Sequence, residues 1–189
     1  MSKFHKKLDA ARVNQSYVQV ARSPKYATAY LEGFVVEVGK SWVLLAQTRD
    51  GGWPNGYVAF RLRDVTSLRS SKGISERFAR LQPCWPPTHS FNALNLDDAA
   101  GVITSLSAGG ELIGIEQEFD RSAMWVGEVE DLWPKWVWLD EVDFTGTWLD
   151  KPLGYRLRKV TAVTTGTPYF EALRQVSDPR GQKRTGERG

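Results

Sequence analysis

Apolar and polar residues alternate along most of this chain. A period of two places every second side chain on the same face of a strand, which is typical of a half-buried sheet. In the first half the alternation predicts five strands, near residues 16–22, 27–38, 41–48, 56–63 and 64–69. In the second half it predicts five more, near 111–118, 123–132, 135–143, 153–158 and 160–164. The pattern therefore indicates a mainly β protein.

Short helices and turns separate these strands. Helical spacing of apolar residues predicts helices near 3–12, 74–81, 96–107 and 168–176. Glycine, proline, asparagine and aspartate supply the backbone angles that reversals need, so we expect turns at Asp50–Gly52, Pro54–Gly56, Gly146 and Lys151–Pro152. Prolines at 83, 86 and 87 disfavour a helix or central strand, so residues 82–95 are expected to be a linker.

The two halves repeat one another. RLRDVT at 61–66 recurs as RLRKVT at 156–161, and WVLL at 42–45 recurs as WVWL at 136–139. A glycine, Gly33 or Gly127, stands nine residues before each tryptophan, and an aromatic residue three positions before a leucine closes each copy, at 78 and at 170. We therefore predict two tandem five-stranded small β-barrels with short flanking helices, at 1–81 and 96–176. The basic segment 177–189 is expected to be a disordered tail.

Composition and charge narrow the classes of protein. With 41% hydrophobic and 25% charged residues, and no long apolar run, the chain is expected to be a cytoplasmic protein without a membrane span or secretory signal. Residues 1–94 hold 14 Lys/Arg against 6 Asp/Glu, a balance of +8, and residues 95–189 hold 11 against 16, a balance of −5. Opposite charges favour docking of the halves or head-to-tail association of chains, although drift between two copies gives the same numbers.

A helix followed by five strongly bent strands resembles the Sm-like fold. That family's first motif combines a glycine with spaced apolar residues, which match Gly33, Val35, Val38, Trp42 and Leu44 in the first copy and Gly127, Val129, Leu132, Trp136 and Trp138 in the second. The resemblance implies a small barrel in each copy. An SH3-like barrel gives almost the same alternation, so both architectures remain open.

The nucleotide-pocket residues of the Sm-like motif are largely absent. The positions of its Asp and Asn hold Gly39 and Val43 in the first copy, and tryptophan and valine in the second. Its arginine is kept in both copies, but the glycine after it is not. Weak RNA or single-stranded nucleic-acid binding is therefore the alternative function, with phosphate contacts expected from Arg61, Arg63, Lys72, Arg158 and the tail.

Eight tryptophans are many for a chain of 189 residues. Trp136 and Trp138 share one face of their predicted strand, while Val137 and Leu139 share the other. If the helix near 96–107 covers the tryptophans, they belong to the core. If it does not, they form an apolar patch that binds another protein or a second copy of the chain.

No catalytic, cofactor-binding or metal-ligating pattern is found. Acidic residues between 128 and 150 alternate with apolar ones, as on a solvated strand face, and Cys84 and His89 lack the local signature of a thiol protease. Two histidines and one cysteine do not compose a usual zinc site, and no phosphate-binding loop is present. We expect no cofactor, no metal and no enzymatic activity.

The sequence therefore predicts a non-enzymatic interaction or scaffold module whose partner is a second copy or another protein. Salt separates this prediction from nucleic-acid binding, because only phosphate contacts weaken steeply as ionic strength rises. A third hypothesis is a small-molecule sensor with a pocket between the copies, at a buried polar cluster containing Arg156 and Glu171.

Overall fold

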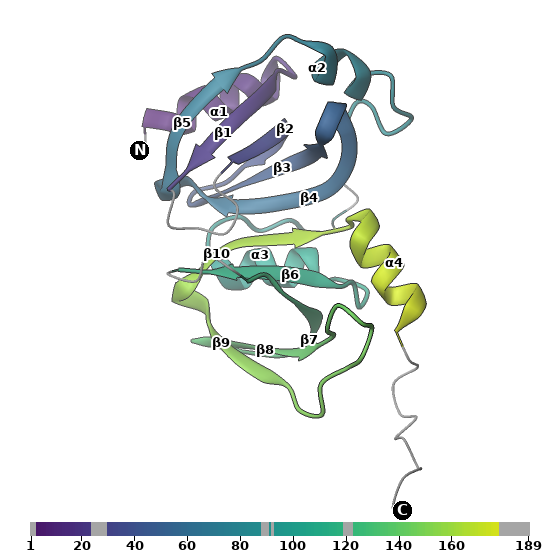
Figure 1. Cartoon of the computed structure of the whole chain (residues 1–189). Coiled ribbons are helices and arrows are strands. Elements are labelled where there is room, and N and C mark those ends of the chain that lie inside the picture. Colours follow the sequence, from purple (N-terminus) through teal and green to yellow (C-terminus); the bar gives the residue numbers. More distant parts are fainter. Residues whose placement is uncertain (1–2, 24–29, 88–90, 92, 119–122, 178–189) are drawn as a thin grey trace, which may run out of the picture.

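The computed structural model describes residues 3–23, 30–87, 91, 93–118 and 123–177 (Figure 1). His89 and nearly all of the predicted tail lie outside the described residues. The first half contains the strands β1 (Tyr17–Arg22), β2 (Tyr30–Val38), β3 (Trp42–Arg49), β4 (Trp53–Arg61) and β5 (Val65–Ser70). The second half contains β6 (Ile113–Gln117), β7 (Trp125–Trp133), β8 (Trp136–Glu141), β9 (Leu153–Arg156) and β10 (Val160–Thr165).

Four α-helices and three short 3-10 turns complete the described part of the chain. The helices are α1 (Lys3–Val13), α2 (Ile74–Ala79), α3 (Ala99–Leu106) and α4 (Pro168–Val176). The 3-10 turns are η1 (Asp50–Gly52), η2 (Leu62–Asp64) and η3 (Leu157–Lys159). Each predicted strand and helix has a counterpart whose ends differ by no more than three residues. The prediction of a mainly β protein with short helices is confirmed.

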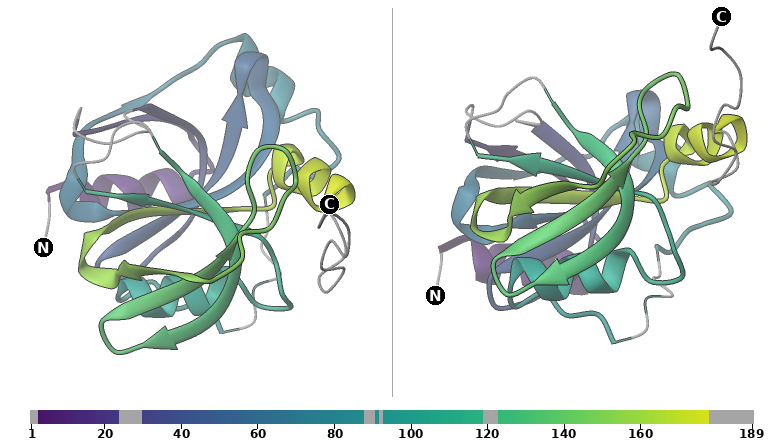
Figure 2. Two further views of the ribbon diagram at one scale, coloured as in Figure 1. Left: turned by 60° about the horizontal axis from the view of Figure 1, so that its bottom comes forward. Right: turned by 90° about the horizontal axis from the view of Figure 1, so that it is seen from below.

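All ten strands belong to one antiparallel sheet, in the order β5-β1-β2-β3-β4-β10-β6-β7-β8-β9 (Figure 1). The prediction of two separate closed barrels is wrong in this respect, because β4 of the first half pairs with β10 of the second and makes the sheet continuous. The strands of the two halves are not interleaved. Two further views show how strongly the sheet curls within each half (Figure 2).

Each half has the same strand order, since β5-β1-β2-β3-β4 matches β10-β6-β7-β8-β9. Irregular pairing also recurs at matching places, after Val35 in β2 and after Val129 in β7. Trp42 pairs with Arg61 in the first half, as Trp136 pairs with Arg156 in the second. The repeated residues thus stand at repeated positions of the sheet.

The repeated glycine permits a close approach of two strands. A Cβ on Gly33, whose φ is 147°, would lie 2.0 Å from the carbonyl oxygen of Ala46 on β3. A Cβ on Gly127 would lie 2.2 Å from the carbonyl oxygen of Asp140 on β8. Only a residue without a side chain fits where β2 meets β3 and where β7 meets β8.

The two largest apolar clusters pack against the sheet. In the first half, α1 packs Phe4, Leu8 and Ala11 against buried residues of β1–β5. In the second, α3 packs Val102, Ile103 and Leu106 against a cluster that also contains Trp42, Leu44 and Ala59 of the first half. The second core therefore crosses the boundary between the halves. Among the described residues, no helix is long and apolar enough to cross a membrane.

One local prediction from the sequence is wrong. Pro54–Gly56 is not a turn but part of β4, where Gly56 has a φ of 71° beside an irregularity in the β3–β4 pairing. The repeated aromatic–leucine pair has different surroundings in the two halves. Leu173 of α4 is buried, whereas Leu81 lies beyond the end of α2 and is 80% exposed.

Candidate functional site at the joint between the halves

The joint between the halves is an antiparallel strand pair. Val58 of β4 lies opposite Thr164 of β10, and Ala59 lies opposite Val163. Both strands are buried along this contact. Side chains alternate across it, so that Ala59 and Val163 contribute to the cluster under α3, while Val58 contributes to the cluster under α1. The joint is therefore packed on both faces of the sheet.

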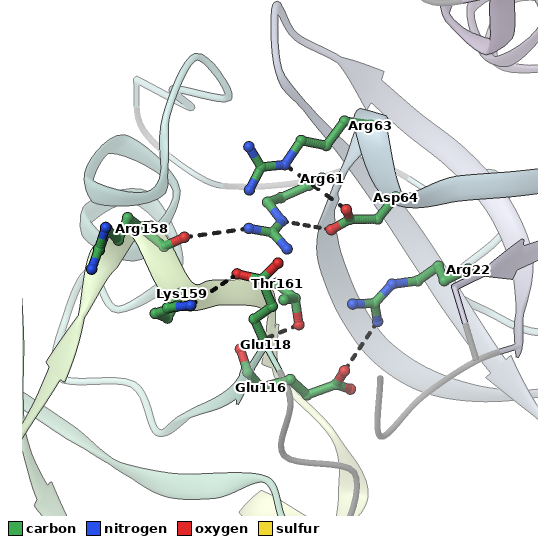
Figure 3. A network of polar contacts seen from close by, with 9 residues as sticks. All are labelled: Arg22, Arg61, Arg63, Asp64, Glu116, Glu118, Arg158, Lys159 and Thr161. Carbon is green, nitrogen blue, oxygen red and sulfur yellow. Dashed lines mark hydrogen bonds and ion pairs between the residues drawn. The ribbon is translucent and has the colours of Figure 1, made fainter. Parts of the chain in front are cut away.

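A buried ion pair also links the halves. Nη1 of Arg22, the last residue of β1, lies 3.1 Å from Oε2 of Glu116 on β6, and both side chains are almost completely shielded from solvent (Figure 3). The hydroxyl of Thr161 on β10 donates to the backbone oxygen of Glu116 at 3.3 Å. The polar cluster buried between the halves therefore centres on Arg22 and Glu116. Arg156 and Glu171, proposed for it from the sequence, are both exposed.

Arg61 is a structural residue of the joint. Its Nε donates to Oδ2 of Asp64 at 2.5 Å, and both residues are buried. Its Nη1 donates to the backbone oxygen of Arg158 in the second half at 3.4 Å (Figure 3). Arg61 and Asp64 are three positions apart in the sequence, and the 3-10 turn η2 brings their side chains together. The guanidinium predicted to contact phosphate thus joins η2 to η3.

A cavity of about 430 Å³ opens beside this network. Its walls come from α1, the β2–β3 turn, η2, the start of α3 and η3. Its charged or titratable lining residues are His5, Lys40, Arg61, Arg63, Asp97, Asp98 and Arg158. The structure thus brings together three of the four predicted nucleic-acid contacts. Lys72, the fourth, is exposed in the loop after β5 and does not line the cavity.

The cavity has an excess of positive charge. Lys40, Arg63 and Arg158 are exposed at its rim. Asp64 already accepts from Arg61 and lies 3.9 Å from Nε of Arg63. Lys40 and Arg158 form no ion pair with another described residue. An anion entering the cavity would therefore meet cationic side chains from both halves.

Trp133, Trp136 and Trp138 lie close together on β7 and β8. Trp136 and Trp138 are partly exposed, and Trp133 is 52% exposed; we call these three residues the tryptophan ridge. The ring centroids of Trp133 and Trp138 lie 5.6 Å apart, and the guanidinium carbon of Arg156 lies 5.0 Å from the Trp136 centroid. Helix α3 packs on the opposite face of β8, against Val137 and Leu139. The helix therefore does not cover the ridge.

Glu141 and Tyr155 form a second buried polar contact, inside the second half. The hydroxyl of Tyr155 on β9 donates to Oε1 of Glu141 on β8. Burial raises the pKa of Glu141, although the hydrogen bond from Tyr155 opposes this shift. Burial and the neighbouring carboxylate raise the pKa of Tyr155. The tyrosine is therefore held as a hydrogen-bond donor.

Several residues of the joint were not predicted from the sequence. Arg22 and Glu116 are separated by 94 positions, so no local pattern connects them. Lys40 and His5 lie in separate segments and carry no motif. The Arg61–Asp64 spacing was visible, and an arginine three positions before an aspartate on a tight turn is a signal for a local ion pair.

No group of three His, Cys, Asp or Glu side chains that could hold a metal ion occurs in the part of the chain that the structure describes. Comparisons with protein-family models, curated proteins and solved structures give no match. A function is therefore assigned from the geometry of the joint, from its cavity and from the strands at the two ends of the sheet.

Proposed function

We propose that this chain is a self-associating, non-enzymatic scaffold module built from two small barrel units of the Sm-like or SH3-like kind. In this proposal β9 of one copy pairs with β5 of the next. The observation that carries it is the β4–β10 joint, because this joint already connects the two halves of the sheet within the chain.

The two ends of the sheet are the equivalents of the strands that form the joint. By strand order, β9 takes the place of β4 in the second half, and β5 takes the place of β10 in the first. Both lie at the ends of the ten-stranded sheet, and each pairs with one described strand only. An unpaired strand edge is a template for pairing with another chain. Repetition of the internal joint would therefore generate a head-to-tail assembly.

The repeat also gives the register of the proposed contact. RLR at 61–63 and RLR at 156–158 differ by 95 positions. The internal pair Val58–Thr164 then corresponds to Leu153 of one copy opposite Arg69 of the next. Leu153 is 44% exposed and Arg69 is exposed, so both are accessible to a partner. The charge balances of +8 and −5 favour the same head-to-tail contact.

A cysteine pair tests the register directly. Arg69→Cys and Leu153→Cys are combined in a Cys84→Ser background, which removes the single native cysteine. The two new thiols lie at opposite ends of the sheet, so they can meet only between chains. Opposed residues of antiparallel strands are within disulfide range. We expect a ladder of disulfide-linked multimers on a non-reducing gel after mild oxidation.

In the matched control, Arg69→Cys is combined with Arg156→Cys. Arg156 lies three residues, or about 10 Å along the strand, from Leu153. This pair should give few multimers. Light scattering coupled to size exclusion on the unmodified chain measures association without cross-linking. A monomer at every protein concentration, together with equal ladders from both cysteine pairs, would refute the proposal.

Single-stranded nucleic-acid binding is the second candidate, because Lys40, Arg63 and Arg158 surround the cavity at the joint. The test is fluorescence anisotropy of a labelled random RNA at several salt concentrations. If RNA binds in the cavity, Arg63→Ala and Arg158→Ala should each weaken the affinity. Each should also reduce the slope of log affinity against log salt concentration by about the value of one phosphate contact. Lys72→Ala, outside the cavity, serves as the charge-matched control.

A further inference from the structure

A second hollow, of about 210 Å³, lies between the first half and the linker. Strands β2, β3 and β4, the end of α2 and the linker contribute to its walls, and Gly166 of the second half also lines it. It is separate from the cationic cavity at the joint, with which it shares no lining residue. Its small volume lies below the usual range for drug-sized ligands, so a molecule of one or two rings would fill it.

Aromatic rings form its walls. The ring centroids of Phe34 on β2 and Trp85 in the linker lie 4.4 Å apart, with the ring planes tilted by 53°. Tyr57 on β4 contributes a third ring. At this separation the Phe34 and Trp85 rings pack against each other, which holds the Trp85 ring at the wall of the hollow.

The Trp85 wall is fixed before any ligand arrives. The guanidinium carbon of Arg80 lies 4.4 Å from the Trp85 centroid and 5.2 Å from the Phe34 centroid. Arg80 is itself held by Glu76, at 2.9 Å from Nη2, and by the backbone oxygen of Gln15, at 2.8 Å. Because the rings are already held in place, less conformational freedom is lost on binding.

The lining selects for a neutral ligand. It contains no Asp, Glu, Lys, Arg or His. A charged molecule would lose its hydration there without gaining a counter-charge. Burial raises the pKa of Tyr57, with a smaller contribution from Cys84, so that this phenol also stays neutral. Ala46 and Thr48 of β3 face the hollow, on the same side of the sheet as Phe34 and Tyr57.

We propose that this hollow is a binding site for a small, neutral, planar aromatic molecule. Tyr57 and Trp85 pack against its ring. Such a ligand would bridge β3, β4 and the linker, and it would hold the linker against the first half.

Cys84 provides the assay, because it lines the hollow and is the single cysteine of the chain. The rate of Cys84 alkylation by iodoacetamide is measured on the full chain with increasing indole. A filled site should slow the reaction at least fivefold at saturation.

Ala79→Phe places a ring in the hollow and should remove protection, while Ala172→Phe, an exposed change on α4, should retain it. Calorimetry of indole binding gives an independent measurement if Ala79→Phe fails to fold, with Trp85→Ala expected to lose the heat signal and Trp133→Ala to keep it. The proposal is wrong if indole neither slows alkylation nor releases heat. It is also wrong if protection persists in Ala79→Phe, or if Trp85→Ala binds indole as tightly as the unmodified chain.

Discussion

Arg22 and Glu116 form an ion pair of 3.1 Å that is almost completely enclosed by protein and joins β1 of the first half to β6 of the second. Two charges removed from water must compensate each other, since the loss of hydration is expensive for each of them. The pair therefore makes the placement of the two halves depend on both residues. It adds a polar constraint to the apolar packing at the β4–β10 joint.

Removal of one member of this pair should be more damaging than removal of both. We expect Arg22→Met or Glu116→Leu alone to lower the free energy of unfolding by about 3–5 kcal/mol, because each removes the ion-pair partner of a buried charge. The double variant should lose clearly less than the sum of the two. Urea unfolding of the four proteins completes the double-mutant cycle. Additive losses would show that the two charges do not interact in solution.

Glu141 should make stability depend on pH. Burial raises its pKa in the folded chain, so the unfolded chain loses this proton first as pH rises. Its contribution to the free energy of unfolding should therefore fall between its ordinary pKa, about 4.3, and the raised folded value, and stay constant above it. Glu141→Gln should lack this decrease. The difference between the two proteins in urea unfolding, measured from pH 4 to 8, isolates the effect from other carboxylates.

Gly33 should tolerate no side chain. Gly33→Ala would place a Cβ 2.0 Å from the carbonyl oxygen of Ala46 at an unfavourable φ, so β2 and β3 must separate. We expect a loss of about 3 kcal/mol in the free energy of unfolding. Gly73→Ala is the matched control, because its Cβ would meet nothing within 4 Å, and it should cost less than about 1 kcal/mol. Similar losses for both variants would contradict this account.

The sequence was sufficient to predict the strands and helices and their repetition in the two halves. Alternation is dictated by one buried face of each strand, so Trp136–Leu139 and its counterpart in the first half could be placed without a structure. The glycine nine residues earlier was equally informative, because it marks a backbone approach that every other residue would obstruct. These signals are local, and each half carries them in full.

The joint could not be predicted for the same reason. A strand edge such as that of β4 has the same alternation whether it pairs within its chain, with another chain or with solvent. Arg61 illustrates the problem at one residue. A basic side chain beside a turn indicates a phosphate contact, but Arg61 is buried and paired with Asp64. In the second half, Lys159 stands at the position that matches Asp64. Arg156 is consequently free of such a partner and lies over Trp136.

The tryptophan ridge should contribute to association through its place beside β9. Trp136 pairs with Arg156 and Trp138 with Gly154 across β8 and β9, so a partner strand on β9 would lie close to the ridge. We expect Trp136→Ala to weaken self-association at least fivefold, measured by sedimentation equilibrium, because a large aromatic surface would be lost from the contact. Trp53→Ala removes a more exposed ring from the first half and should leave association unchanged. Equal effects of the two substitutions would place the contact elsewhere.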